Sequence, residues 1–477
     1  MELDSPHRLI TTQQMYAADQ QTIDAGISEK QLIANAAARV CAEIITRYDK
    51  CPVLVLAGPG NNGADGLMAA EILMGEGWPV TIWKYTKDKV QPDLSGVGLI
   101  VDALFGAGLS KPLGGVLQEL VSQVNQCAAN VLSIDIPTGI DGNTGHARPT
   151  AIQADLTVTF FRQKPGHVLY PGRAHAGEIV CKEIDISAQT LNDVGAPTLY
   201  ENHPDLWRKD FSKRTTDSHK YKHGHVLTVS GPMRTTGAAR LAARGALRAG
   251  AGLVSIAAPA SALMVHAVHL TAIMLEKCNE GADLTTLAED KRKNVILVGP
   301  GLGVNKRGRD IVQAALACPA ALILDADALT LYRHDPHILF KAIKDRKAPV
   351  ILTPHGGEFS RLFGSLADMP KIEVTMQAAK ISGATIAYKG PDTVIATHGQ
   401  ECVINSTASP HLATAGSGDV LAGIIAGLFA QGMEPLKAAC AGVWLHGTAG
   451  LELGPGLIAG DIPPVLPKLL KQTFYSD

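Results

Sequence analysis

The chain has 477 residues, 46% of them hydrophobic and 18% charged, with a formal net charge of −2. This length predicts two folded domains rather than one core, and the near-neutral charge gives no electrostatic case for binding nucleic acid or an acidic membrane. The 8 cysteines show no Cys-x-x-Cys spacing, and the longest uncharged apolar run, residues 420–430, is shorter than a membrane span. We therefore expect a cytoplasmic protein with reduced thiols, without a zinc site and without a membrane partner.

The first half alternates predicted strands and helices. Residues 11–24 and 28–47 are predicted helices, the second begun by a capping box of Ser28 and Gln31. The apolar run at residues 51–57 predicts a strand buried on both faces, which leads into a glycine loop at residues 58–66 and a helix from Leu67. Further strands are predicted at residues 78–85, 97–104, 131–134, 156–160 and 177–186, with a helix at 116–124. This alternation predicts an α/β fold, a Rossmann-like three-layer domain with a mostly parallel sheet.

Polar residues gather where these strands end. They occupy residues 61–65, Asp102, residues 106–112 and residues 135–138, and ligands of parallel sheets bind at the carboxyl ends of the strands. Amide, hydroxyl and carboxylate oxygens without thiolate or imidazole suit a hard monovalent or divalent cation rather than zinc. Each residue taken singly is more often a satisfied turn residue, but their convergence on one sheet edge favours a binding site.

Three of these segments resemble the NAD(P)H-hydrate epimerase domain, the YjeF N-terminal family. They are residues 58–66 (Gly-Pro-Gly-Asn-Asn-Gly-Ala-Asp-Gly), 101–106 (Val-Asp-Ala-Leu-Phe-Gly) and 133–139 (Ser-Ile-Asp-Ile-Pro-Thr-Gly), and the likeness covers nearly all of residues 10–190. It implies a potassium ion on Asn62, Asp102 and Thr138, and a catalytic Asp135 at the reacting nicotinamide ring. The hydrate itself would contact Asn61, Asn62, Gly63, Ala64, Asp65, Gly106, Ala107, Gly108, Leu109, Ser110, Lys111, Pro112 and Asp135. Ala64 stands where glycine is frequent in the family.

The implied reaction makes chemical sense. Two epimers of a 6-hydroxylated dihydronicotinamide interconvert if the carbon–oxygen bond opens and re-forms on the other face of the ring. This needs an acid or base near the hydroxyl and stabilisation of a cationic ring, which a carboxylate offers.

Residues 196–217 lose this periodicity and predict a linker, so we expect domains at residues 1–212 and 213–477. His219, His223 and His225 follow without an accompanying carboxylate or cysteine, which favours an anion-contacting loop or a solvated turn over a metal site. Strands are predicted at residues 226–230, 253–258, 294–298, 321–324, 350–352 and 386–388, and an alanine-rich helix at 237–248. They predict a second α/β sheet.

Residues 414–419 precede an apolar helix that starts at Val420. Gly416 and Gly418 leave the backbone donors of a helix start open to a phosphate. Asp419 would repel that phosphate and is better explained as a base for a hydroxyl that attacks it. By itself this stretch is equally compatible with a glycine turn capped by an acid.

The second half resembles the ribokinase-like superfamily and, within it, the ADP-dependent NAD(P)H-hydrate dehydratase, the YjeF C-terminal family. The segments are residues 299–303, 353–358, 389–393 and 415–419, within a likeness over about residues 215–470; Gly356 replaces the family's usual proline. The resemblance implies that the hydrate or the adenine nucleotide contacts Ala238, Gly303, His355, Lys389, Gly390, Pro391, Asp392, Thr393, Gly418 and Asp419. Asp419 would take the proton of the hydrate's hydroxyl, which attacks the terminal phosphoryl of ADP with the help of Mg²⁺. Phosphate then leaves and NAD(P)H and AMP remain.

Together the halves predict a bifunctional metabolite-repair enzyme, whose partners are NAD(P)H hydrate, an adenine nucleotide and further copies of itself in a homo-oligomer. Two alternatives stay open. The second half could be a vitamin-type kinase, which shares the glycine loop but does not account for residues 353–358 or the fused first half. The first half could be a nucleotide-binding module without turnover.

Overall fold

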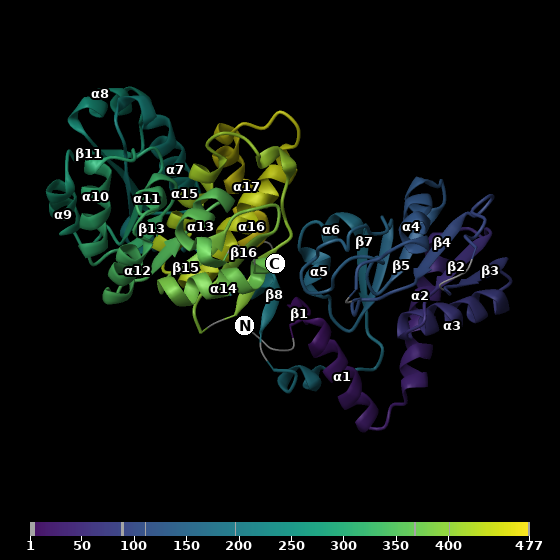
Figure 1. The fold of residues 1–477 in the computed structure, drawn as a ribbon. Helices are drawn as coiled ribbons and strands as arrows, with labels where there is room; N and C mark the ends of the chain where they lie inside the picture. The colour runs from purple at the N-terminus through teal and green to yellow at the C-terminus, as the bar shows by residue number, and fades with distance from the viewer. Residues whose placement is uncertain are drawn as a thin grey trace. The chain divides into compact units, whose positions relative to one another are not determined.

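The computed structural model describes residues 5–86, 90–109, 111–195, 197–366, 369–399 and 401–475. The chain divides into a first unit, Met1–Glu201, and a second unit, Asn202–Asp477 (Figure 1). Among the described helices, none is both long enough and apolar enough to cross a bilayer.

The first unit is built on a six-stranded parallel sheet. Its strand order is β3-β2-β4-β5-β6-β7, so the chain reverses direction across the sheet between β2 and β4. The strands are β2 (Val53–Ala57), β3 (Val80–Lys84), β4 (Leu99–Ala103), β5 (Asn130–Ile134), β6 (Leu156–Phe160) and β7 (Glu178–Lys182). Such a reversal leaves a crevice at the carboxyl ends of the two strands, which is where ligands bind in doubly wound sheets.

Helices cover both faces of this sheet (Figure 1). Along β2, Val53 and Val55 face one hydrophobic cluster while Leu54 and Leu56 face the other, which explains the uninterrupted apolar run. The first cluster includes residues of α1 (Thr12–Asp24), α2 (Glu29–Arg47) and α3 (Asn61–Gly75), and the second includes residues of α4 (Val116–Gln126). The predicted three-layer α/β arrangement is confirmed. The remaining elements are α5 (Pro165–Val168), α6 (Gly172–His175), η1 (Ala188–Asn192) and an antiparallel pair, β1 (Arg8–Leu9) with β8 (Leu199–Glu201).

The capping box predicted at Ser28 is only half formed. The Gln31 N–H donates to Ser28 Oγ at 3.2 Å, but the Gln31 side chain donates to Asn35 instead of returning to the cap. A complete box occurs one helix earlier, where Thr11 and Gln14 bond each other reciprocally. The helix start at Ser28 was therefore predicted correctly, but the reciprocal hydrogen bonds of a capping box form at Thr11 and Gln14 instead.

The second unit has a larger mixed sheet. From β17 the order is β17-β16-β15-β14-β13-β12-β9-β10-β11, with β15-β16 and β16-β17 antiparallel and the other pairs parallel. The strands are β9 (His225–Val229), β10 (Leu253–Ala258), β11 (Met274–Lys277), β12 (Val295–Val298), β13 (Ala321–Leu324), β14 (Val350–Leu352), β15 (Thr385–Tyr388), β16 (Thr393–Ala396) and β17 (Cys402–Asn405). The longer helices are α7 (Thr236–Arg248), α8 (Ala260–His269), α9 (Gly281–Ala288), α10 (Lys306–Ala317), α12 (Pro336–Asp345), α13 (Gly356–Phe363), α14 (Lys371–Ser382), α15 (Ser417–Ala430), α16 (Pro435–Leu453) and α17 (Ile462–Phe474).

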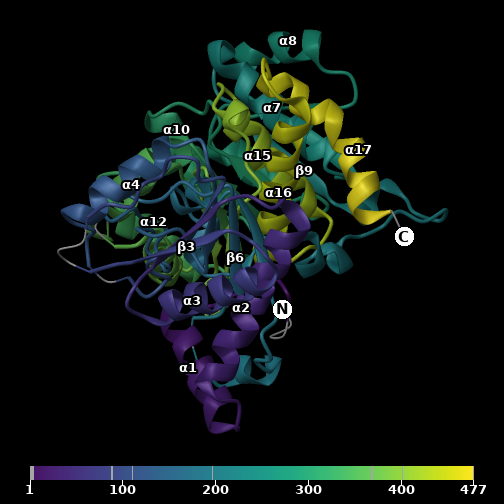
Figure 2. The same ribbon diagram turned by 90° about the vertical axis from the view of Figure 1, so that its right-hand side faces the viewer.

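Helix α15 is the buried centre of this unit. Residues 420–430 are all buried, and α15 packs between α7 and α16 (Figure 2). The longest apolar run of the chain is thus a core helix.

The aperiodic segment expected to be a linker is ordered and packed. Trp207 is fully buried, and its ring centroid lies 5.8 Å from that of Trp444 and 5.6 Å from that of Phe474. Phe211 stacks on Phe474 at 3.9 Å. These contacts belong to the second unit, so the low periodicity here reflects short 3-10 turns rather than free chain. A functional boundary after residue 212 stays a prediction.

Candidate functional site

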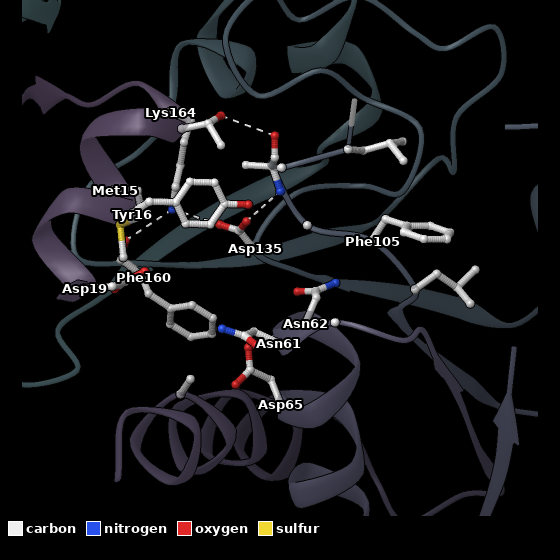
Figure 3. A pocket seen from close by; sticks show the side chains of 18 of the residues that line it. Met15, Tyr16, Asp19, Asn61, Asn62, Asp65, Phe105, Asp135, Phe160 and Lys164 are labelled. Atoms are coloured by element: carbon white, nitrogen blue, oxygen red, sulfur yellow. Dashed lines mark hydrogen bonds and ion pairs between the residues drawn. The ribbon is translucent and has the colours of Figure 1, made fainter. Parts of the chain in front are cut away.

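A cavity of about 710 Å³ opens where β2, β4 and β5 of the first unit end (Figure 3). Its walls include these residues predicted from the sequence: Asn61, Asn62, Asp65, Gly106, Ala107, Gly108, Leu109, Lys111, Pro112 and Asp135. Gly63 and Ala64 are not part of the wall; they belong to the first turn of α3, where the Ala64 N–H donates to Gly60 O at 3.1 Å. Ser110 lies outside the described residues. The carboxyl ends of these strands therefore bring most of the predicted residues together.

Asp135 is fixed at the centre of this cavity. Its Oδ1 lies 2.8 Å from Lys164 Nζ, and its Oδ2 accepts the Ala107 N–H at 2.8 Å. Its backbone has a φ of 66°, a left-handed conformation that costs free energy for a residue with a side chain. Burial by itself would raise its pKa, but the Lys164 ammonium and the Ala107 amide hold the pKa of Asp135 down at about 2. Asp135 is therefore a permanent anion at neutral pH.

His167 holds the backbone of Asp135 through a hydrogen bond. The Lys164 N–H donates to His167 Nδ1 at 2.9 Å, so the ring hydrogen lies on Nε2, which donates to the Asp135 carbonyl at 2.7 Å. Burial lowers the pKa of His167 to about 4, which keeps this arrangement neutral.

Lys164, Tyr16 and Asp19 line the cavity but were missed from the sequence. Lys164 follows the carboxyl end of β6, so the strand-end argument applied to that strand could have found it. Tyr16 and Asp19 come from α1, whose polar face carries no signal that separates a cavity wall from solvent. Burial raises the pKa of Asp19 to about 6, and the charges of Asp135 and Glu29 add to this effect. Burial together with Asp135 and Asp19 also raises the pKa of Asp65 well above its usual range.

The predicted cation ligands Asp102 and Thr138 are in direct contact. Thr138 Oγ1 donates to Asp102 Oδ1 at 2.6 Å, and the Phe105 N–H donates to Thr138 Oγ1 at 3.0 Å. Asp102 is fully buried, which raises its pKa against the opposing hydrogen bonds of Thr138 and Ser133. Asn62 is the unusual member: both polar atoms of its buried amide lack a hydrogen-bond partner within the described part of the chain. An unpaired buried amide is costly and indicates a missing ligand.

In the second unit, Lys389 and Asp419 lie near the N-terminus of α15. Gly416 precedes the helix with a φ of 85°, no side chain caps it, and a Cβ on Gly418 would lie 3.5 Å from Lys389 Nζ. Lys389 Nζ also lies 2.8 Å from Asp325 Oδ1. An open helix start and an ammonium group both attract anions.

Asp419 has a pKa far above that of an ordinary aspartate. Burial comes first among the causes, and the carboxylates of Asp325, Asp327 and Glu358 outweigh Lys389, so that the pKa rises to about 7. A base that titrates at neutral pH suits proton abstraction from a hydroxyl.

The other residues predicted for this unit lie on separate elements of the fold. His355 caps α13 by accepting the Gly357 N–H at 3.0 Å, while the His355 N–H donates to Glu358 Oε2 at 2.9 Å. The Gly303 N–H donates to Asp327 Oδ2 at 2.8 Å, and a Cβ on Gly301 would lie 3.1 Å from Ala238 Cβ.

Residues 389–392 form the turn between β15 and β16, and Thr393 begins β16. The Gly390 N–H donates to Thr393 Oγ1 at 3.3 Å, and Pro391 follows Gly390. Asp392 is bound by Lys371, whose Nζ also donates to the Asp392 carbonyl at 2.9 Å. This ion pair holds the Asp392 carboxylate within the turn.

In the segment of His219, His223 and His225, the ring of His225 has a side-chain hydrogen-bond partner. His225 Nε2 lies 2.9 Å from Ser255 Oγ on the neighbouring strand. Within the described residues, no group of three metal-ligating side chains includes His219, His223 or His225.

Known proteins match both units. The family described as NAD(P)H-hydrate dehydratase matches residues 226–465, and the YjeF-related protein N-terminus matches residues 29–96 and 84–166. A bifunctional NAD(P)H-hydrate repair enzyme of Thermofilum pendens is 34% identical over 94% of this chain and 93% of its own length. The chain belongs to the bifunctional NAD(P)H-hydrate repair enzyme family. A second such enzyme, from Moorella thermoacetica, is 32% identical over 92% of each chain.

Solved structures support the fold of the second unit of this repair-enzyme chain. A ribokinase-like superfamily protein of Enterococcus faecalis has a TM-score of 0.52 and 27% identity, over 58% of this chain and 97% of that one. The ADP/ATP-dependent NAD(P)H-hydrate dehydratase of Bacillus subtilis, co-crystallised with ATP and Mg²⁺, has a TM-score of 0.50 and 29% identity, over 57% and 98%. The predicted family and the predicted ribokinase-like fold are both confirmed.

Proposed function

We propose that the first unit interconverts the R and S epimers of NAD(P)H hydrate, and that the second dehydrates the S epimer while ADP becomes AMP and phosphate. The observation that carries this proposal is that the two units hold a carboxylate in opposite ways. Asp135 is paired with Lys164 and accepts the Ala107 N–H, which hold its pKa at about 2. Asp419 lies in the first turn of α15, where burial and neighbouring carboxylates raise its pKa to about 7. A permanent anion suits a cationic ring, whereas a carboxylate that titrates near neutrality suits a base. Homo-oligomer formation and a cytoplasmic location remain predictions.

In the epimerase site, Asp135 faces the nicotinamide ring. When the ring hydroxyl leaves, the ring nitrogen shares its lone pair and the ring becomes cationic. Asp135 stabilises that charge, and Lys164 and Ala107 hold the carboxylate in place before the reaction begins, so no reorganisation is needed. Gly106 and Gly108 line the same cavity, and a side chain on either would meet Asp135 or Tyr16.

Potassium is proposed for the same site, with Asn62, Asp102 and Thr138 as its ligands. The donor set fits, because it consists of oxygens and because the buried amide oxygen of Asn62 has no partner among the described residues. A bound cation would supply positive charge next to the substrate's phosphates. Asn62 and Thr138 would also fix the two strand-tip loops that carry Gly106 and Asp135.

In the dehydratase site, Asp419 removes the proton of the hydrate's hydroxyl, and that oxygen attacks the terminal phosphoryl group of ADP. Lys389 and the open start of α15 bind the phosphates and receive the growing negative charge. Mg²⁺ accompanies the nucleotide and neutralises its phosphates; carboxylates of Asp325, Asp327 and Glu358 near Asp419 are the oxygen donors it prefers. Phosphate then departs as the ring nitrogen lone pair forms a carbon–nitrogen double bond, and loss of a proton from the neighbouring ring carbon restores the dihydronicotinamide ring.

The full-length chain tests this proposal directly. Purified S epimer, ADP and Mg²⁺ should restore the absorbance of reduced nicotinamide, with one AMP and one phosphate formed per molecule. Purified R epimer should be consumed to the same end point. A vitamin-type kinase would leave the absorbance flat, and a first unit that only binds would leave the R epimer to its uncatalysed conversion.

A further inference from the structure

Asp19 is a carboxylate of the epimerase cavity that the resemblance does not account for. It lies on α1, the helix that also presents Met15 and Tyr16 to the cavity (Figure 3). Within the described part of the chain, its side chain has neither a hydrogen-bond partner nor an ion-pair partner, in contrast to Asp135. An unpartnered carboxylate in a cavity wall remains free to bond a substrate oxygen.

The reaction needs a proton donor that Asp135 cannot provide. Lys164 and the Ala107 amide saturate Asp135 and lower its pKa to about 2, so its acid form is almost absent at neutral pH. Lys164 is itself committed to Asp135, to Thr159 Oγ1 at 3.0 Å and to the Phe160 carbonyl. Hydroxide is a poor leaving group, so the ring hydroxyl must be protonated by another side chain.

The charged groups around Asp19 come from every wall of the cavity. Asp135 and Glu29 are negative neighbours and Lys164 is the positive one. Asp65, whose own pKa is raised well above its usual range, is a further carboxyl group nearby, and Tyr16 lies one turn earlier on the same helix. Burial and the charges of Asp135 and Glu29 raise the pKa of Asp19 to about 6. When one site raises the pKa of one carboxyl group and lowers that of another, the first can serve as an acid while the second stays ionised.

We propose that Asp19 exchanges the proton with the hydroxyl oxygen that leaves and rejoins the nicotinamide ring, an inference that rests on the proposed epimerase function. Asp19 in its acid form protonates the hydroxyl, and the carbon–oxygen bond breaks with its electron pair on the departing water. The ring nitrogen lone pair forms the carbon–nitrogen double bond, and Asp135 stabilises the cation. A water oxygen then adds to the same carbon from the opposite face, the double-bond pair returns to nitrogen, and the proton that this water loses restores the acid form of Asp19.

The test follows interconversion of the purified R and S epimers by the full-length chain without ADP, so that the dehydratase is idle. Asp19→Asn should slow the enzyme-catalysed rate by about 10²–10⁴-fold. The wild-type rate at saturating substrate should fall tenfold per pH unit above about 6, and the residual rate of Asp19→Asn should lose this slope. Asp19→Glu should recover part of the rate and regain a slope.

Asp24→Asn is the matched control, because it removes an exposed carboxylate from the same helix outside the cavity wall. Its rate should equal that of the wild type. All these variants should keep the unfolding temperature of the wild-type first unit, which shows that this unit folds, and dehydration of the S epimer by the second unit should be normal. An unchanged rate in Asp19→Asn overturns the proposal, as does a slow variant that keeps the wild-type pH profile. If the wild type itself fails to interconvert the epimers, the epimerase function falls first.

Discussion

Lys164 Nζ lies 2.8 Å from Asp135 Oδ1, and the two side chains are 2% and 19% exposed. The ammonium is thus withdrawn from water while the carboxylate still reaches the cavity. Charge in a water-poor site is expensive unless it is paired. The pair therefore keeps the Asp135 carboxylate ionised at the cavity, at the expense of a second buried charge.

Lys164→Met should leave that anion uncompensated. We expect the free energy of unfolding of the first unit to fall by about 3 kcal/mol, because one partner of a buried pair is lost while the other remains. Asp135 will respond by accepting a proton, so epimerisation should fall with it. Chemical denaturation and the ADP-free epimer assay measure the two effects.

The double variant Lys164→Met with Asp135→Asn is the control for this interpretation. Since it removes both charges, it should be more stable than Lys164→Met alone although equally inactive. Additive losses of stability would contradict a direct coupling between the two residues.

Asn62→Leu should abolish potassium binding without destabilising the fold itself. In the wild type, K⁺ at ten times its dissociation constant should stabilise the first unit by about 1.4 kcal/mol. The leucine variant should melt at the same temperature in KCl and in tetramethylammonium chloride of equal ionic strength. It should not be less stable than the wild type without potassium, because the unpaired amide is gone. A potassium-specific shift that survives in Asn62→Leu would show that the ion binds elsewhere.

The sequence predicted the strand-tip residues well for a physical reason. Val53–Ala57 and Leu99–Ala103 are short apolar runs buried on both faces, so the polar residues after them are forced to one edge of the sheet. Asn62, Asp102 and Asp135 follow from that rule, and the same rule applied after Phe160 leads to Lys164.

Asp19 and Tyr16 could not be found this way. Helix α1 is polar even at most of its buried positions, which include Thr12, Gln14 and Thr22, so its sequence does not separate a cavity wall from a surface exposed to solvent. Strands β16 and β17 are as long as β13, which was predicted, but they were missed because β16 leads into β17 rather than into a helix. Charge pairing across elements, such as Lys164 with Asp135, likewise depends on packing that no local pattern records.

Gly106→Ala should damage the epimerase site through sterics alone. A Cβ at this position would lie 2.8 Å from Asp135 Oδ2 and 3.4 Å from Asn62 Oδ1, so one of these two groups must move. We expect epimerisation to drop at least about tenfold and dehydration of the S epimer to be unchanged. Gly114→Ala is the matched control, because its Cβ would meet no atom within 4 Å. Equal activity of the two variants would mean that the loop adapts at no cost.

Asp419→Asn should leave nucleotide binding intact and reduce dehydration by several decades, since it removes one base and no binding surface. The wild-type dehydration rate should fall tenfold per pH unit below about 7, where Asp419 becomes protonated. Isothermal titration with ADP and the absorbance assay at saturating S epimer measure the two properties. Unchanged turnover in the variant would refute the role of Asp419.

The same substitution should change how stability depends on pH. The pKa of Asp419 is about 7 in the folded chain against 3.8 for an ordinary aspartate, so the folded state holds this proton more tightly than the unfolded state. The resulting stabilisation is present below pH 3.8 and is lost as pH rises to about 7. Asp419→Asn lacks this titration, and at pH 8 it should melt about 2–4 °C higher than the wild type, which corresponds to about 1 kcal/mol. A lower melting temperature at pH 8 would mean that the ionised carboxylate is a net source of stability through Lys389, and that its base strength has another origin.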